Sequence, residues 1–110
     1  MPKYIFQAMY SGEGIRGLEK DKALGRKAVL GTAVESLAGK LEALYWTFGE
    51  HDWVLLADLP DNASATAFSL AVSRSGLLRV VTTTLVSAEE MDAAFQKKVN
   101  FKTPGELPSG

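Results

Sequence analysis

The sequence predicts an α+β domain of the ferredoxin-like class, with the order β-α-β-β-α-β, a four-stranded antiparallel sheet and a short C-terminal helix. Three observations lead to this prediction. Four stretches have the composition and alternation of strands, and two stretches have the apolar spacing of helices. A short turn joins the second and third strands, whereas helices join the other consecutive strands. Right-handed crossovers then place the strands in the order 4-1-3-2, with both long helices on one face.

The first strand is expected over residues 4–10, where Tyr4, Phe6, Ala8 and Tyr10 alternate with Ile5, Gln7 and Met9. The first helix is expected over residues 24–38, because its apolar residues recur at helical spacing. Gly39 stands where a left-handed cap is expected. Glycines at 17, 25 and 31 weaken this segment as a helix, so residues 12–21 are expected to be irregular or briefly helical.

Residues 40–48 and 51–59 are the expected second and third strands, with a turn at Gly49 and Glu50. Leu41, Ala43 and Tyr45 are predicted to share one face of the second strand, opposite to Leu44, Trp46 and Phe48. Pro60 ends the third strand, and Asp61 or Asn62 is expected to cap a second helix. The predicted inner face of that helix is Ala63, Ala67, Phe68, Leu70 and Ala71.

The second helix is expected to run to about Ser75 and to stop at Gly76. Residues 77–86 are rich in β-branched residues and form the fourth strand. Ser87 and Glu90 have the spacing of a capping box, which starts a short helix to about Lys98. We therefore expect one domain over residues 1–98 and a C-terminal tail over 99–110, which holds two prolines and two glycines.

Composition excludes several classes of function. The 110 residues contain no cysteine, which excludes disulfides, thiolate metal sites and a cysteine nucleophile. With a single histidine, no metal site and no cofactor are expected. The net charge is −1, and the basic residues 16–27 are not interleaved with aromatic side chains, so neither nucleic acid nor a membrane surface is expected as a partner. The N-terminus does not have the pattern of a signal peptide, so a cytoplasmic protein is expected.

The strands are apolar on both faces, although two helices cover only one of them. A solvated face of an antiparallel sheet would be polar. A bare apolar face of this size exceeds what monomers usually expose. We therefore expect a second copy of the chain to cover the open face and form a homodimer or a higher homo-oligomer.

The chain resembles the GYD domain family of small bacterial proteins over about residues 2–92. The resemblance rests on PKYIFQAMYSGEGIRGL, on AVESLAGKLEALYWTFGEHDWVLLADLPDNASATAFSLAVSRSG and on LLRVVTTTLVSAEEMD. Gly49 and Asp52 correspond to the glycine and aspartate of the family's Gly-Tyr-Asp signature, and His51 stands where the family has tyrosine. The resemblance implies a ferredoxin-like domain akin to the dimeric α/β-barrel group, and it implies no activity.

Candidate site residues surround the predicted hairpin. His51 could act as a general base, since histidine titrates near neutrality, and Asp52 as a pocket carboxylate; the alternatives are a solvated side chain and an aspartate that accepts turn N–H groups. Arg79, within an apolar strand, could bind an anion or pair with a carboxylate such as Asp52 or Asp58; the alternative is an exposed strand end. Tyr10, Tyr45 and Trp46 are candidate ligand contacts, with packing as the alternative. Trp53 is interpreted as a core or interface residue.

The segment from Gly12 to Gly17 has the spelling G-x-G-x-x-G, but it precedes a hairpin and not the parallel strands of a dinucleotide site. The alternatives are an anion-binding loop and a flexible start of the first helix. The expected function is a homo-oligomeric module that binds a small ligand or has a regulatory role. One alternative is a cofactor-independent enzyme of the monooxygenase, isomerase or decarboxylase type, with His51 as base. Another is a purely structural assembly protein.

Overall fold

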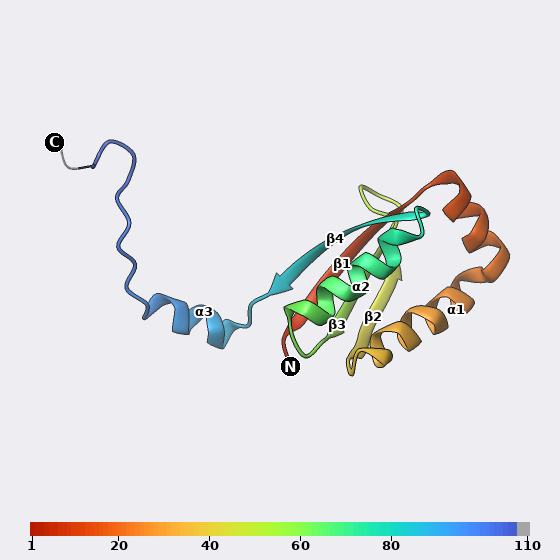
Figure 1. Cartoon of the computed structure of the whole chain (residues 1–110), viewed down its shortest axis with the longest axis horizontal. Coiled ribbons are helices and arrows are strands. Elements are labelled where there is room, and N and C mark those ends of the chain that lie inside the picture. Colours follow the sequence, from red (N-terminus) through yellow and green to blue (C-terminus); the bar gives the residue numbers. More distant parts are fainter. Residues whose placement is uncertain (108–110) are drawn as a thin grey trace.

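A computed structural model describes residues 1–107 and confirms the predicted α+β arrangement (Figure 1). Within these residues the elements are β1 (Lys3–Tyr10), α1 (Gly12–Ser36), β2 (Lys40–Trp46), β3 (Trp53–Asp58), α2 (Asn62–Arg74), β4 (Leu78–Leu85) and α3 (Ala88–Phe95). The strands form one antiparallel sheet in the order β2-β3-β1-β4. This is the predicted order 4-1-3-2, read from the other edge.

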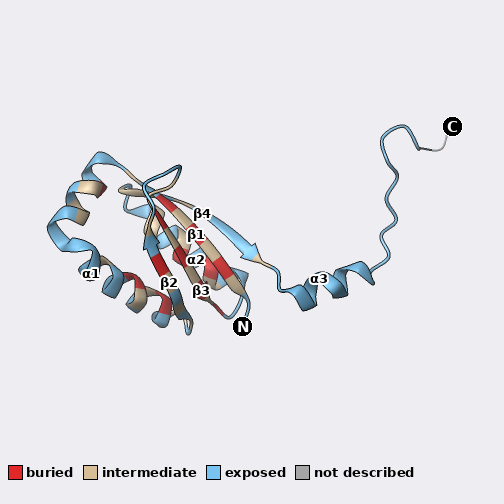
Figure 2. Cartoon of the chain, turned by 180° about the vertical axis from the view of Figure 1, so that it is seen from behind, coloured by how far each residue is buried: buried red, intermediate tan, exposed pale blue. Residues whose placement is uncertain are grey.

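The hydrophobic core fills the space between one face of the sheet and the helices α1 and α2. In Figure 1, α2 lies in front of the strands, and in Figure 2, seen from behind, the strands lie in front of α2. The largest fully buried side chains are Trp53, Tyr4, Phe6, Phe68, Leu55, Leu59 and Val34. The rings of Phe6 and Phe68 meet edge to face, with centroids 4.7 Å apart, so the sheet and α2 pack directly against each other.

The alternation predicted for β1 is confirmed, whereas that for β2 is wrong at its start. The register between β2 and β3 shifts between Leu41 and Ala43, where β2 carries an extra residue. Leu41 pairs with the buried Ala57, while Ala43 pairs with Leu56 on the other face. Because opposite residues in an antiparallel ladder share a face, the irregularity turns Leu41 toward the core. An alternation pattern cannot reveal such an extra residue.

The connection between β2 and β3 is longer than the predicted turn at 49–50. Strand β2 ends at Trp46 and β3 begins at Trp53, which leaves a loop over residues 47–52. A 2.8 Å hydrogen bond from the amide of the loop's first residue to the carbonyl of its last residue closes it. Phe48 adopts the left-handed backbone, with φ of 45°, although glycine next to it would adopt that conformation more readily.

Helix α1 bends once and ends in a different way from the prediction. Lys22 is non-helical, with φ of 67° and ψ of 160°, so the predicted lead-in is a helical segment joined to a longer one at a bend. After the helix, the left-handed residue is Ala38, with φ of 60°, and not Gly39. Gly39 is needed for a different reason, because a Cβ there would lie 2.5 Å from the carbonyl oxygen of Asp58.

Helix α2 begins and stops as predicted, but its inner face differs. The Asp61 carboxylate accepts a 2.8 Å hydrogen bond from the amide of Ser64, and these contacts with Ser64 hold the pKa of Asp61 below its usual value. Gly76, with φ of 75°, follows the helix. The buried residues are Ala65 and Phe68. Four predicted inner residues are exposed: Ala63, Ala67, Leu70 and Ala71. Phe68 sets the inward direction of the helix. Ala65 and Val72, about one turn before and after it, face the sheet with it.

The chain leaves the body of the molecule after β4, and we call residues 86–107 the arm. The predicted capping box of Ser87 and Glu90 is confirmed, and α3 stops at Phe95, before the expected Lys98. All residues of α3 are exposed, and the arm extends the molecule to 63 Å (Figure 1). The radius of gyration of 18.2 Å exceeds the roughly 13 Å of a compact chain of this length. Residues 108–110, the end of the predicted tail, lie outside the described residues.

None of the helices within residues 1–107 has the length and apolar character needed to cross a membrane.

The first turn of α1 is held against the start of β4. The amide of Ser11 donates a 2.8 Å hydrogen bond to the carbonyl of Leu77, and the Ser11 hydroxyl caps the helix by accepting from the amide of Gly14. A Cβ on Gly14 would lie 2.3 Å from the same Leu77 oxygen, whereas one on Gly17 would meet nothing within 4 Å. Close packing therefore accounts for the middle glycine of the G-x-G-x-x-G spelling.

We predict that Gly14→Ala lowers the free energy of unfolding by about 1–3 kcal/mol, since the new methyl group must push backbone atoms apart. The matched control is Gly17→Ala in the same helix. It should raise stability by about 0.5–1 kcal/mol, because alanine restricts the unfolded chain more than glycine does. Urea unfolding of both variants checks this, and equal effects would refute the packing explanation.

Candidate functional site

The core layer contains a cavity of about 210 Å³ between α1, α2 and the sheet. It lies at the end of the sheet where β1 ends and where β3 and β4 begin. Its wall consists of Tyr10, Trp53 and Leu78 from the sheet, Arg26, Val29, Leu30 and Ala33 from α1, and Phe68, Ala71, Val72 and Ser75 from α2 and its C-cap. Most of these side chains are apolar.

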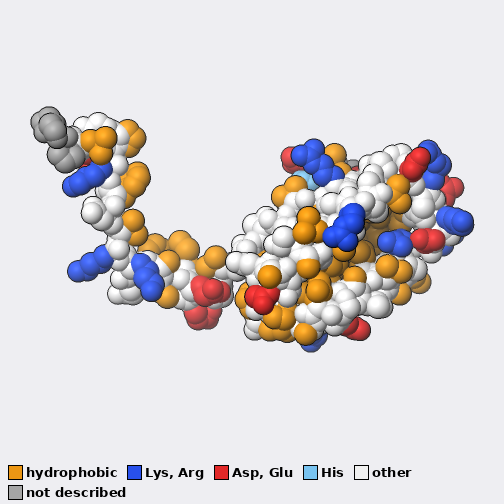
Figure 3. Space-filling view, viewed as in Figure 1, with side chains coloured by type: hydrophobic (Ala, Val, Ile, Leu, Met, Phe, Trp, Pro, Cys, Tyr) orange, Lys and Arg blue, Asp and Glu red, His pale blue; other side chains and the backbone are white. Residues whose placement is uncertain are grey.

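The cavity has a buried floor and an exposed rim. Trp53 and Phe68 are each 1% exposed and form part of the floor, whereas Val29 at the rim is 49% exposed. Figure 3 shows a recess between α2 and α1 in which hydrophobic side chains are visible. A small molecule can therefore reach the buried surface from solvent.

The bend in α1 explains why the two helices leave this part of the sheet uncovered. Before Lys22, the first half of α1 turns away from the sheet, and after it the second half runs back along the sheet (Figure 1). Arg26 lies one turn after the bend. Val29 and Leu30 follow at the third and fourth positions, so all three side chains share one helix face.

Tyr10 brings its hydroxyl group into contact with the indole of Trp46. The Nε1 of Trp46 donates a hydrogen bond of 3.3 Å to the Tyr10 oxygen, so the phenolic proton remains free to be donated. Burial raises the pKa of Tyr10, while the hydrogen bond from Trp46 and the charge of Arg26 act against this effect. The phenol is therefore neutral at physiological pH and can serve as a donor.

Trp53 carries the clearest sign of an incomplete site. Its Nε1 is buried and has no hydrogen-bond partner among residues 1–107. The indole of Trp53 acts against the rise in the pKa of Tyr10, but no hydrogen bond joins the two side chains. A buried unpaired N–H costs about 1–3 kcal/mol, so native proteins usually satisfy such groups with protein, water or ligand atoms.

Arg26 gives the cavity its charge. Its Nη1 lies 3.3 Å from Oδ2 of Asp21, and 30% of its side chain is exposed. Asp21 is not part of the cavity wall, and no lining side chain within the described residues is acidic. Arg26 and Tyr10 line the same cavity, and the charge of Arg26 acts against the rise in the pKa of Tyr10. We call the lining residues Arg26, Tyr10 and Trp53 the donor corner, which combines one cation with two neutral donors.

The predicted site residues divide between this cavity and other parts of the fold. Tyr10 and Trp46 meet at the cavity, whereas Tyr45 is 67% exposed on the opposite face of the sheet. Asp52 does not enter the cavity. Its Oδ2 accepts a 2.7 Å hydrogen bond from the backbone amide of Tyr10, so it joins the 47–52 loop to the end of β1.

His51, Asp52 and Arg79 do not line one closed pocket. His51 borders a shallow hollow on the open face of the sheet, together with Gln7 and Val54. Arg79 pairs with Met9 across the ladder and is exposed on that same face, but it is not among the residues that line the hollow. Within residues 1–107, no group of three His, Cys, Asp or Glu side chains is arranged to hold a metal ion.

Sequence reasoning missed two residues of the cavity, Arg26 and Trp53. Arg26 belongs to the basic residues 16–27, which were considered only for nucleic-acid or membrane binding, although its spacing of three and four from Val29 and Leu30 puts it at the edge of an apolar stripe. Trp53 was interpreted as a packing residue, which is correct for its ring. The unpaired indole N–H became visible only in three dimensions.

Comparison with known proteins identifies one family. A family model described as GYD domain matches residues 4–95, which includes the strands and helices of the described chain, apart from Lys3 at the start of β1, and every residue that lines the cavity. No curated protein matches the chain.

The raised pKa of Tyr10 predicts a specific alkaline titration. In the folded protein one phenol should ionise above the ordinary value of 10.0, and this component should be missing in Tyr10→Phe, which keeps the ring. The unfolded chain loses the proton at the ordinary value while the folded chain still holds it. The contribution of Tyr10 to the free energy of unfolding is therefore complete below pH 10.0. It is lost as the pH rises through the pKa that Tyr10 has in the folded protein.

Absorbance of the phenolates, measured against pH in folded and urea-unfolded protein, checks this prediction. The difference between wild type and Tyr10→Phe isolates the titration of the Tyr10 phenol. If this phenol ionises at the same pH in folded and in unfolded protein, the assigned environment of Tyr10 is wrong.

Proposed function

The chain belongs to the GYD domain family, and we propose that it is a homo-oligomeric module that binds a small ligand in the cavity between its helices and its sheet. The observation that carries this proposal is the mostly apolar cavity itself, which opens to solvent at its rim and is lined by Tyr10, Arg26 and Trp53. Trp53 also has a buried Nε1 without a hydrogen-bond partner among residues 1–107.

The composition of the cavity supports the same conclusion. Small-molecule sites are concave and mostly apolar, with a few polar groups that fix the orientation of the ligand. Here the apolar wall carries a phenol from Tyr10, an indole N–H from Trp53 and a guanidinium from Arg26. A module whose only role is assembly would have no use for a solvent-accessible cavity with unpaired donors.

The open face of the sheet supports the homo-oligomeric part of the proposal. This face, turned toward the viewer in Figure 2, carries apolar side chains on every strand. They are Ile5 and Met9 on β1, Tyr45 on β2, Val54 and Leu56 on β3, and Val81 on β4. Tyr45 is 67%, Val81 49% and Met9 47% exposed in the single chain. Gln7, Arg79 and Thr83 lie among them on the same face. Exposed apolar surface of this kind marks interaction sites.

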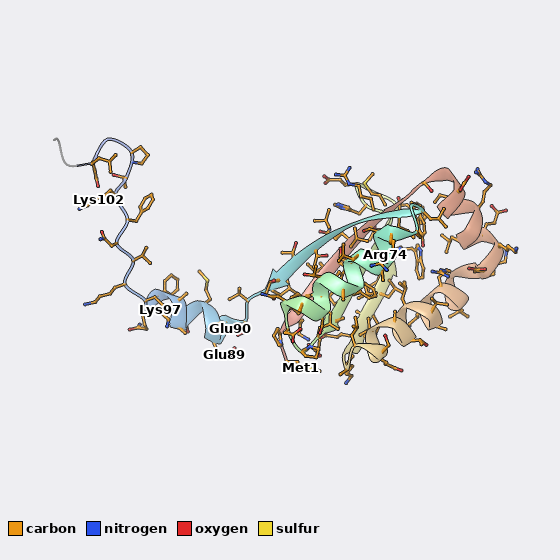
Figure 4. All side chains as sticks on the ribbon, in the orientation of Figure 1. Met1, Arg74, Glu89, Glu90, Lys97 and Lys102 are labelled. Atoms are coloured by element: carbon orange, nitrogen blue, oxygen red, sulfur yellow. The ribbon has the colours of Figure 1, made fainter. Side chains whose placement is uncertain are left out.

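The arm supplies further surface for a second copy. Strands of 6–8 residues at about 4.8 Å spacing give the open face a flat area of roughly 450 Å². A stable interface buries about 800 Å² on each partner, so the face alone is small for that purpose. The arm exposes Val86, Met91, Phe95, Val99, Phe101 and Leu107. In Figure 4 its charged side chains Glu89, Glu90, Lys97 and Lys102 lie along it, away from the body.

The enzyme alternative has less support. It requires His51 as base and Arg79 as anion clamp around one substrate. His51 borders a shallow hollow, and Arg79 does not line it. The carboxylate of Asp52 is engaged with the amide of Tyr10. These residues therefore offer no convergent reaction centre in the single chain, whereas Tyr10, Arg26 and Trp53 line one cavity.

We predict that Tyr45→Glu converts the oligomer to monomers at micromolar concentration. The side chain is exposed in the single chain, so the substitution leaves the fold intact, but it buries a charge against the second copy. Leu24→Glu is the matched control, because Leu24 is 81% exposed on α1 and away from the open face. Sedimentation equilibrium gives the result. A monomeric wild type at the same concentration would exclude the homo-oligomer.

We also predict that the protein, purified from its own host, carries a small molecule that Ala33→Phe excludes. Ala33 lines the cavity, and a phenyl group there occupies most of the space. The control is Ala28→Phe, an exposed position on the same helix that does not line the cavity. Native mass spectrometry compares the three proteins. If none of them carries a bound molecule, or if Ala33→Phe retains it, the cavity is not the binding site.

A further inference from the structure

The polar groups of the cavity are donors and not acceptors. The Trp53 indole can only donate, and the Tyr10 oxygen already accepts from Trp46, which leaves its proton for a ligand. Arg26 has five N–H donors, and one of its nitrogens, Nη1, donates to the carboxylate of Asp21. The ligand must therefore present acceptors where these groups meet.

Tyr10, Trp53 and Arg26 all line the same cavity, and Trp46 already donates to the Tyr10 oxygen. The charge of Arg26 and the indole of Trp53 both act against the rise in the pKa of Tyr10, in agreement with this shared cavity. A carboxylate has two oxygens and about four acceptor positions, so it can accept from the guanidinium and from a neutral donor at the same time. No acidic side chain within the described residues lines the cavity to compete for these donors.

The volume limits the remainder of the ligand. An apolar cavity of about 150 Å³ accommodates benzene. The 210 Å³ found here is therefore suited to one ring with a small substituent. Phe68, Val72 and Leu30 form an apolar surface for that ring, and the exposed Ser75 lies at the rim, with its hydroxyl already donating to the carbonyl of Val72.

We propose that the cavity binds a small monocarboxylate with an apolar body about the size of one ring, with its carboxylate at Arg26, Tyr10 and Trp53 and its apolar body against Phe68, Val72 and Leu30. This inference rests on the proposed ligand-binding function and adds the chemical class of the ligand. One cation and no anion in the wall favour a single negative charge. Binding pairs the carboxylate with Arg26 and removes apolar surface of the ligand from water in one step.

The test uses the full-length protein and three probes of similar size: benzoate, the neutral benzamide and the doubly charged phenyl phosphate. The chain has two tryptophans, so its indole N–H region in a ¹H–¹⁵N NMR spectrum contains two signals, and Trp53→Phe assigns them. Titration should move the Trp53 signal with benzoate at the lowest concentration. Benzamide, which lacks the charge, should bind roughly tenfold more weakly or worse.

Variants separate the charge from the cavity itself. Arg26→Gln should weaken benzoate binding roughly ten- to hundredfold and leave benzamide binding little changed. Arg26→Lys, which keeps the positive charge, should lose less affinity for benzoate than Arg26→Gln. Lys27→Gln is the matched control, because Lys27 is the exposed neighbour on the same helix and does not line the cavity. Thermal unfolding of each variant confirms that it is folded.

The outcomes distinguish this inference from the function on which it rests. Equal affinities for benzoate and benzamide, unchanged in Arg26→Gln, would overturn the carboxylate class while leaving a ligand-binding cavity. If phenyl phosphate binds more tightly than benzoate, the proposal that the ligand carries a single negative charge is wrong. If no probe moves the Trp53 signal, the ligand class is wrong. The proposed function fails separately, when native mass spectrometry of the host-purified protein finds no bound molecule.

Discussion

Two helices cover one face of a four-stranded sheet, and this one-sided coverage determines the rest of the structure. The covered face holds the core around Trp53, Phe6 and Phe68. Coverage is incomplete at one corner, because α1 bends at Lys22, and the cavity occupies that corner. The other face carries exposed apolar side chains that no helix covers, which is unfavourable for an isolated chain in water. The proposed ligand site and the proposed interface are therefore two consequences of the same arrangement.

The residues of the family's signature gain a physical role from this arrangement. Asp52 accepts the amide proton of Tyr10, the last residue of β1, and so fixes the backbone beside the cavity. The Tyr10 ring then extends to Trp46 and to the donor corner. The loop 47–52 thus positions a candidate ligand-binding tyrosine from outside the cavity. His51 lies on the other side of the sheet, where a second copy would approach it.

Local patterns predicted much of the fold. Alternation identified the buried face of β1, and caps at Asp61 and Ser87 marked the starts of two helices, because these signals depend on neighbouring residues alone. The extra residue at the start of β2, the left-handed Ala38 and the inward face of α2 depend on contacts between distant segments, and the sequence does not show them. The donor corner was missed for the same reason, since Arg26, Tyr10 and Trp53 come together only in the folded chain.

Two of the chain's three methionines offer the most direct test of one-sided coverage. In the single chain Met1 is 70% exposed at the N-terminus, and Met9 is 47% exposed on the open face. Oxidation by dilute peroxide, followed by peptide mass spectrometry, compares the same chemical group at both places. If a second copy covers the open face, Met9 is oxidised much more slowly than Met1 at micromolar concentration and loses this protection on dilution. Met9 oxidation at a rate near that of Met1, independent of concentration, would contradict the account.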